Sequence, residues 1–126
     1  MPTAVTSKKI LVVDDDKAIT ILLEGLLSKE GYIVSVAYDG LDGMVKVKSI
    51  IPDLIILDIM MPEINGYDVC SNLKFDEKFK HIPIIVLTSR QQELDGRIGK
   101  LMGIDYMHKP IDSRILLEKI QNAFKK

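Results

Sequence analysis

Five short apolar runs alternate with segments whose apolar residues recur at helical spacing, and this alternation constrains the fold more than any other feature. A run of about four to eight apolar residues is typical of a buried strand, whereas apolar residues three and four positions apart are typical of a helix with one buried face. The alternation therefore predicts a βα unit repeated five times. The predicted strands are Lys9–Asp14, Tyr32–Ala37, Leu54–Asp58, Ile82–Thr88 and Tyr106–His108.

The first, third and fourth runs are apolar almost throughout instead of alternating with polar residues. Strands of this kind are buried on both faces, as in a parallel sheet that helices cover on both sides. The predicted fold class is α/β, with a five-stranded parallel sheet in a three-layer sandwich. The length of 126 residues and the hydrophobic content of 47% suit one domain. We expect residues 1–8 to form a flexible N-terminal tail and residues 9–126 to form that domain.

The fourth predicted helix, about residues 91–102, contains Gly96 and Gly99. Each glycine destabilises a helix by roughly 1 kcal/mol relative to alanine, so this helix should be marginal by itself. Two interpretations stay open. The glycines permit close packing against a neighbour, or they belong to a segment that shifts when a nearby site changes state.

Charge and cysteine content exclude several classes of protein. Seventeen basic and eighteen acidic residues give a formal net charge of −1, and no basic stripe indicates direct binding of nucleic acid by this chain. No apolar run has membrane-spanning length, and the first nine residues lack the apolar centre of a signal peptide. The single cysteine, Cys70, excludes an internal disulfide and a thiolate metal cluster. We therefore expect a cytoplasmic protein without membrane contact.

Acidic residues close two of the apolar runs. Asp14 and Asp15 follow the first run and Asp58 ends the third. If these runs are neighbouring parallel strands, the carboxylates meet at the carboxyl edge of the sheet, where α/β folds place their ligands. Carboxylates packed together raise one another's pKa and stay ionised only beside positive charge. A divalent cation is the natural candidate.

Two further polar residues belong to the same predicted edge, since Thr88 ends the fourth run and Lys109 follows the fifth. Three carboxylates, a hydroxyl and an ammonium suit phosphoryl transfer, which needs positioning and neutralisation of anionic oxygens. Mg²⁺ prefers a few carboxylates with water and phosphate oxygens, whereas Ca²⁺ takes more oxygen ligands. The predicted cofactor is therefore Mg²⁺, with Mn²⁺ as an alternative.

Several motifs, taken in order, resemble the receiver domain of a two-component response regulator, and the resemblance runs from Lys9 to about Phe124. It implies a flavodoxin-like (βα)5 fold with strand order 2-1-3-4-5, like that of the chemotaxis receivers. The matching segments are Ile10–Asp16, Tyr38–Gly40, Pro52–Pro62, Asn65–Gly66, Pro83–Thr88 and Lys109–Pro110.

The resemblance implies a role for each residue of the site. Asp58 would be the phosphoacceptor, which attacks a phosphohistidine to give an acyl phosphate. The carboxylates of Asp15 and Asp58 and the backbone carbonyl of Met60 would hold Mg²⁺, and Asp14 would act mainly through a water on the metal. A switch of this kind accelerates its own phosphorylation without being a turnover enzyme.

The remaining roles concern signalling. Lys109 would pair with Asp58 at rest and with a phosphoryl oxygen afterwards, Thr88 would hydrogen-bond the phosphoryl group, and Tyr106 would be the switch aromatic. The implied partners are a histidine kinase or phosphotransfer protein and an unidentified output domain or target. We expect a monomer or a weak phosphorylation-dependent dimer. The chain departs from the family around Asp105 and Ile111, which puts in doubt dimerisation through the face of the fourth helix, fifth strand and fifth helix.

Three alternative functions stay open. Asp14 and Asp16 form the Asp-x-Asp pair of a haloacid-dehalogenase-type phosphatase, but Ala18 and the absence of a downstream acidic pair disfavour it. A phosphorylation-independent interaction domain and a flavin-binding domain are the others. We interpret Asp16 as a helix N-cap and not as a metal ligand. The Lys109–Pro110 bond is predicted to be cis, since the chain must turn there to aim the lysine into the site.

Overall fold

The computed structural model describes residues 7–58, 66–88 and 104–125, so the predicted fourth helix and residues 1–6 of the predicted tail lie outside the described residues. All five strands are parallel and adopt the order β2-β1-β3-β4-β5, which confirms the predicted α/β fold class and strand order. The elements are β1 (Lys9–Val13), α1 (Lys17–Lys29), β2 (Ile33–Ala37), α2 (Gly40–Ile50), β3 (Leu54–Asp58), α3 (Gly66–Lys74), β4 (Ile84–Thr88), β5 (Ile104–His108) and α5 (Ser113–Phe124).

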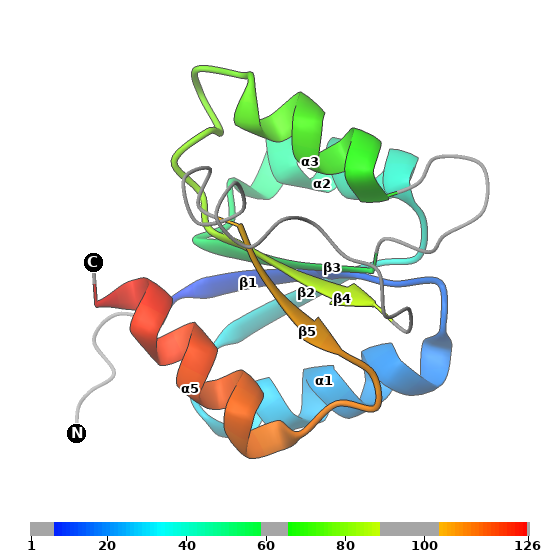
Figure 1. Cartoon of the computed structure of the whole chain (residues 1–126), viewed down its shortest axis with the longest axis vertical. Helices are drawn as coiled ribbons and strands as arrows, with labels where there is room; N and C mark the ends of the chain where they lie inside the picture. The colour runs from blue at the N-terminus through cyan, green and yellow to red at the C-terminus, as the bar shows by residue number, and fades with distance from the viewer. Residues whose placement is uncertain (1–6, 59–65, 89–103, 126) are drawn as a thin grey trace.

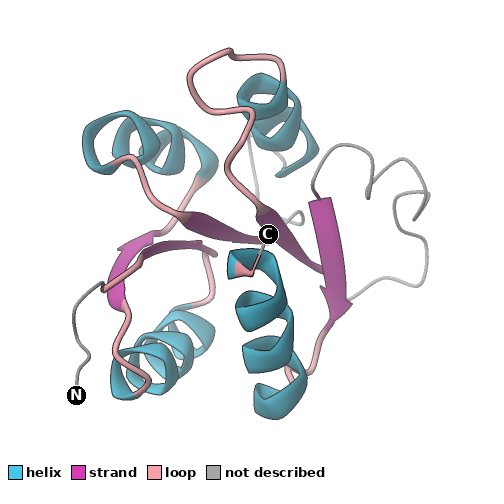
Figure 2. Ribbon diagram, turned by 90° about the vertical axis from the view of Figure 1, so that its left-hand side faces the viewer, coloured by secondary structure: helices cyan, strands magenta, loops and turns pink. Residues whose placement is uncertain are grey.

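Helices cover both faces of the sheet, as the uninterrupted apolar runs predict. α2 and α3 lie on one face and α1 and α5 lie on the other (Figures 1 and 2). Each face carries its own core, because successive strand residues point to opposite sides. Leu11, Val13, Ile55 and Leu57 pack in the core towards α2 and α3, and Ile10, Val12, Leu54 and Ile56 pack in the core towards α1 and α5. Within the described ranges, no helix is both long enough and apolar enough to cross a bilayer.

β5 begins at Ile104, two residues before the predicted start at Tyr106, which corrects the predicted strand. The charged Asp105 interrupts the apolar run and hid this beginning. β5 is the edge strand of the sheet and is only partly covered, so Ile104 is buried whereas its neighbour Asp105 is exposed. The ammonium of Lys119 in α5 lies 3.1 Å from the Asp105 carboxylate and holds it at the surface.

The predicted helix ends are mostly confirmed. Asp16 is the N-cap of α1, where its side chain accepts a hydrogen bond from the backbone N–H of Ala18, at 3.0 Å. Asp112 caps α5, where its side chain accepts from the backbone N–H groups of Arg114 and Ile115. After α1 the chain turns through Gly31 at φ +96°, a left-handed conformation that disfavours any side chain. These caps fix where the chain leaves each strand, and so where the residues that follow β1 and β5 are placed.

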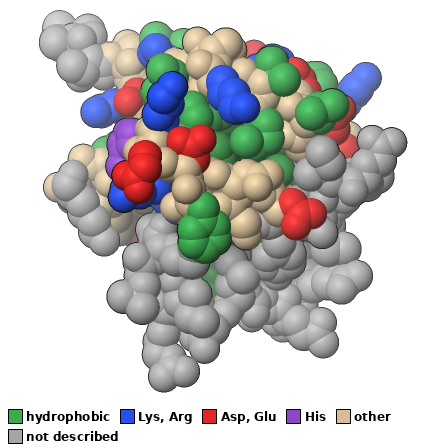
Figure 3. All heavy atoms as spheres, turned by 90° about the horizontal axis from the view of Figure 1, so that it is seen from above, with side chains coloured by type: hydrophobic (Ala, Val, Ile, Leu, Met, Phe, Trp, Pro, Cys, Tyr) green, Lys and Arg blue, Asp and Glu red, His purple; other side chains and the backbone are tan. Residues whose placement is uncertain are grey.

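The outer surface over α2 and α3 exposes apolar side chains beside lysines (Figure 3). The large apolar side chains that belong to this side of the molecule and are exposed are Leu41, Val45, Ile51 and Phe75.

Candidate functional site

The sheet register brings Asp14 and Asp58 side by side. Val13, the last residue of β1, pairs with Leu57 of β3, so the next residue on each strand is an aspartate. Carboxylate oxygens of Asp14, Asp15 and Asp58 lie within 4.8 Å of one another. The predicted meeting of these three side chains at the carboxyl edge is thus observed, and we call them the acidic cluster.

Burial differs sharply within the acidic cluster. Asp14 is 0% exposed and Asp58 is 2% exposed, whereas Asp15 is exposed to solvent. Two carboxylates removed from water need compensating positive charge or hydrogen bonds, because desolvation opposes ionisation. The site therefore has the electrostatics of a place built to receive a cation.

Lys109 supplies one positive charge to the acidic cluster. Its Nζ lies 3.2 Å from Oδ2 of Asp14 and 3.6 Å from Oδ2 of Asp58. The expected contact with Asp58 is present, and the closer contact with Asp14 is an addition to it. The Lys109–Pro110 peptide bond is cis, as predicted.

The pKa of Asp14 is raised from 3.8 to about 6. Burial of the carboxylate is the main cause, and the negative charge of Asp58 adds to it. The backbone N–H of Asp16, which donates to Asp14 Oδ1 at 2.9 Å, and the charge of Lys109 act in the opposite direction. The single ammonium of Lys109 therefore does not balance the negative charge of the acidic cluster.

The donor set fits a hard divalent cation. Within the part of the chain that the structure describes, Oδ2 of Asp14 is buried and accepts no hydrogen bond, although the Lys109 ammonium is near. A buried oxygen with a free lone pair, grouped with two more carboxylates, is suited to oxygen-seeking ions such as Mg²⁺. Met60, the predicted carbonyl ligand, lies outside the described residues.

The structure places the two other predicted residues on neighbouring strands. Thr88 is the last residue of β4 and follows Leu87, the register partner of Asp58, so its backbone lies at the predicted edge. The side chain of Thr88 lies outside the described part of the structure. Tyr106 in β5 is half-buried and packs against the core on the α2 and α3 side. The ring of Tyr106 meets the His108 ring edge-on, with centroids 6.3 Å apart.

One contribution to the site was not predicted, namely the backbone N–H of Asp16. This group donates to Asp14, while the Asp16 side chain caps α1. An aspartate that accepts from the N–H two residues later is a common turn geometry. The Asp14-Asp15-Asp16 run directly before a helix is the sequence signal for this turn. The middle residue of such a turn is directed away from the contact between the first and third residues.

Comparisons with known proteins agree with the geometry of the site. The family described as "Response regulator receiver domain" matches residues 10–121. The response regulator PleD of Caulobacter vibrioides is 40% identical over 121 residues, which cover 92% of this chain and 26% of that protein. The chain therefore spans about a quarter of the length of that curated relative.

Solved structures agree with the family. A crystal structure of a putative response regulator from Chloroflexus aurantiacus has a TM-score of 0.86 at 29% identity and covers 96% of this chain and 100% of that chain. The chemotaxis protein CheY4 of Vibrio cholerae has a TM-score of 0.83 at 28% identity, over 94% of this chain and 99% of that one. Both likenesses extend over nearly the whole chain.

Proposed function

This chain belongs to the response regulator receiver domains, and from that premise we propose that it is the phosphoacceptor switch of a two-component phosphorelay. A carboxylate oxygen of Asp58 attacks the phosphorus of a phosphohistidine on a histidine kinase or phosphotransfer protein. The oxygen–phosphorus bond forms as the phosphorus–nitrogen bond breaks, so that an acyl phosphate and a free imidazole result. The observation that carries the proposal is the acidic cluster, with Lys109 in contact with Asp58.

Each residue of the acidic cluster has a separate task in this proposal. Asp58 is the nucleophile. The carboxylates of Asp15 and Asp58 and the Met60 carbonyl would hold Mg²⁺, and Asp14 would act mainly through a water on the metal. When bound, the ion supplies neutralisation of the incoming phosphoryl oxygens. Lys109 is held at the site by Asp14, so its ammonium remains there when Asp58 becomes an acyl phosphate with negatively charged phosphoryl oxygens.

Access to Asp58 needs a change in the surface above it, because its side chain is only 3% exposed. A donor phosphorus must approach to about 3–3.5 Å of the attacking oxygen before reaction. The proposal therefore requires that a phosphodonor displaces the atoms that cover this carboxylate. Phosphoryl transfer should accordingly be slower than ion binding at the same site.

The signal leaves the site through the switch residues. Thr88 donates its hydroxyl hydrogen to a phosphoryl oxygen, and Tyr106, which is half-buried on the neighbouring strand opposite Val86, then turns inward. β5 and α5 form part of the surface that changes, and an output domain or target protein reads the change. We also propose that the chain acts in the cytoplasm, and as a switch rather than a turnover enzyme.

The test is phosphorylation by a small donor. The purified chain is incubated with Mg²⁺ and acetyl phosphate, and the modified residue is mapped by mass spectrometry. One phosphoryl group on Asp58 is expected, with no modification of Asp58→Asn and full modification of the control Asp105→Asn, whose carboxylate lies at the far end of β5.

Two outcomes would replace the proposal. Phosphate on Asp14 with repeated turnover would identify a phosphatase of the haloacid-dehalogenase type. An unmodified chain that also fails to bind Mg²⁺ would identify a phosphorylation-independent interaction domain.

A further inference from the structure

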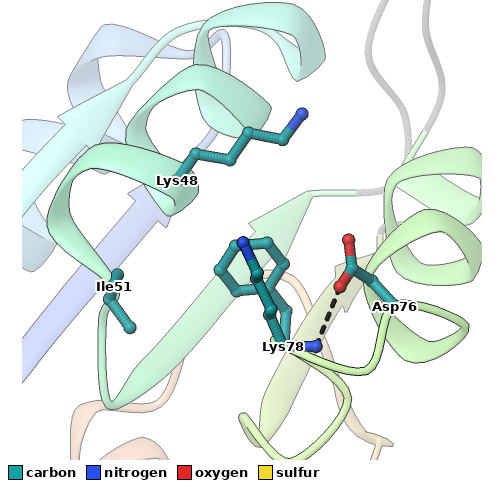
Figure 4. Close-up of a pocket in the computed structure, with 5 residues that line it drawn as sticks. Lys48, Ile51, Asp76 and Lys78 are labelled. Atoms are coloured by element: carbon teal, nitrogen blue, oxygen red, sulfur yellow. Dashed lines mark hydrogen bonds between the residues drawn. The ribbon is translucent and has the colours of Figure 1, made fainter.

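A groove opens at the amino-terminal edge of the sheet, away from the acidic cluster. Its volume is about 630 Å³, and it lies between the end of α2 and the connection from α3 to β4 (Figure 4). β3 starts beside this edge and ends at Asp58, so its five residues, roughly 13 Å long, separate the groove from the proposed phosphoacceptor. The lining residues are Lys48, Ile51, Asp76, Lys78 and Phe79.

Two lysines face this groove from opposite walls. Lys48 comes from α2 and Lys78 from the α3–β4 connection, and both side chains extend over the open space between these elements (Figure 4). In the described part of the chain neither ammonium has an ion-pair partner, whereas the nearby Lys46 and Lys80 pair with carboxylates of their own segments. The groove therefore presents two ammonium groups without an ion pair to incoming carboxylates, beside one acidic residue of its own.

Apolar side chains also line the groove. Phe79 belongs to the core on the α2 and α3 side and also lines the groove, and Ile51 is 55% exposed at the rim. Ile51 has φ +52°, a left-handed conformation that is unfavourable for a β-branched residue and usual for glycine at the end of a helix. This conformation ends α2 and fixes the direction in which the exposed Ile51 side chain leaves the helix.

One acidic group limits what the groove accepts. Asp76 lines the same space, and its Oδ1 accepts a hydrogen bond from the backbone N–H of Lys78 at 2.8 Å. Its negative charge leaves the lining with one net positive charge, so a compact, multiply charged phosphate compound is matched less well than separate carboxylates that each reach one lysine. The remaining carboxylate oxygen is instead suited to accept a peptide N–H.

We propose that this groove docks an acidic peptide segment of a partner protein. The segment would place an apolar side chain over Ile51 and Phe79, and carboxylates on either side of it would pair with Lys48 and Lys78. Charge complementarity and the apolar floor together define this chemistry. Docking would be independent of the phosphorylation state, since the groove and the acidic cluster lie at opposite ends of the strands.

The experiment uses a short synthetic peptide in which glutamates flank a central Leu-Phe pair, titrated into the isotopically labelled full chain. Amide NMR signals of Lys48, Ile51, Lys78 and Phe79 should shift in a saturable manner, and equally in Asp58→Asn. The double variant Lys48→Gln with Lys78→Gln should raise Kd roughly three- to thirtyfold, as expected for two partly exposed ion pairs.

A matched control removes the same number of charges elsewhere. Lys29→Gln with Lys125→Gln, at the exposed ends of α1 and α5, should leave Kd unchanged. An increase of less than about twofold in the groove variant, or an equal increase in the control, would overturn the proposal. So would the absence of saturable shifts, or tighter binding of ADP than of the peptide at the same amides.

Discussion

The carboxylate of Asp14 lies where burial and the charge of Asp58 both oppose its ionisation. A pKa raised from 3.8 to about 6 means that the folded chain holds this proton more tightly than the unfolded chain. Stability of the metal-free protein should therefore fall as pH rises from about 4 to about 6, by about 3 kcal/mol in all. Below about pH 4 Asp14 is protonated in both the folded and the unfolded state, so stability no longer depends on pH through this group.

Asp14→Asn tests this directly. The neutral amide removes the ionisation, so the variant in EDTA should be more stable than the native chain at pH 7, by up to about 3 kcal/mol. The two proteins should have similar stability near pH 4. Urea unfolding at several pH values measures both quantities. A native stability that stays flat or rises over this range would contradict the raised pKa.

At the scale of single elements, Lys74 fixes the connection between α3 and β4. Its side chain is nearly buried, and Nζ donates to the backbone carbonyls of Lys80 at 3.0 Å and of Ile82 at 2.7 Å. Burial lowers the pKa of this lysine, and the two carbonyls compensate for part of the lost hydration. This buried ammonium thus holds the loop that forms one wall of the groove.

Lys74→Met should destabilise the chain by roughly 2–4 kcal/mol, because it leaves two carbonyls without their donor. The control is Lys80→Met, an exposed lysine paired with Glu77 across one turn, for which a loss below about 1 kcal/mol is expected. Urea unfolding compares the two variants. Equal losses would mean that the buried hydrogen bonds of Lys74 contribute nothing specific.

Alanine substitutions at two helix glycines distinguish the effect of helix propensity on stability from the effect of packing. A Cβ on Gly43 of α2 would lie 3.1 Å from both Cγ atoms of Val13, a buried residue of β1, whereas a Cβ on Gly25 of α1 would have no neighbour within 4 Å. Alanine should therefore stabilise the chain by roughly 0.5–1 kcal/mol at Gly25. At Gly43 the crowding of Val13 should cancel or reverse this gain. Equal gains at both positions, measured by thermal unfolding, would contradict the close approach of α2 to β1.

The pattern of apolar residues predicted the strands well, because burial determines where apolar residues occur along a strand. β3 matches its predicted bounds, and β1 differs from its prediction by one residue. Contacts that depend on side-chain geometry were beyond prediction. Nothing in the sequence distinguishes Lys74 from other lysines, because only tertiary folding turns its ammonium towards the carbonyls of the next loop. The nearer contact of Lys109 with Asp14 was hidden for the same reason, since two carboxylates at one edge are equivalent in sequence.

At the scale of the whole molecule, the fold places two separate surfaces at opposite edges of one sheet. Parallel strands bring their carboxyl ends together, which gathers the acidic cluster, and their amino ends together, which leaves the groove beside α2. The helices on the two faces pack against the same sheet through one core on each side. If both proposals hold, the chain would bind one partner at the groove and receive a phosphoryl group at the other edge.

Metal binding should raise the free energy of unfolding of the whole chain. An ion that binds only the folded state adds about 2.7 kcal/mol to the free energy of unfolding when its free concentration is a hundred times Kd. The native chain should therefore unfold at higher urea in Mg²⁺ than in EDTA. Asp15→Asn, at the exposed member of the acidic cluster, should lose most of this gain without losing stability in EDTA, because its carboxylate is already solvated. If Mg²⁺ left the urea midpoint unchanged at every concentration, or stabilised Asp15→Asn as strongly as the native chain, the acidic cluster would not be the metal site.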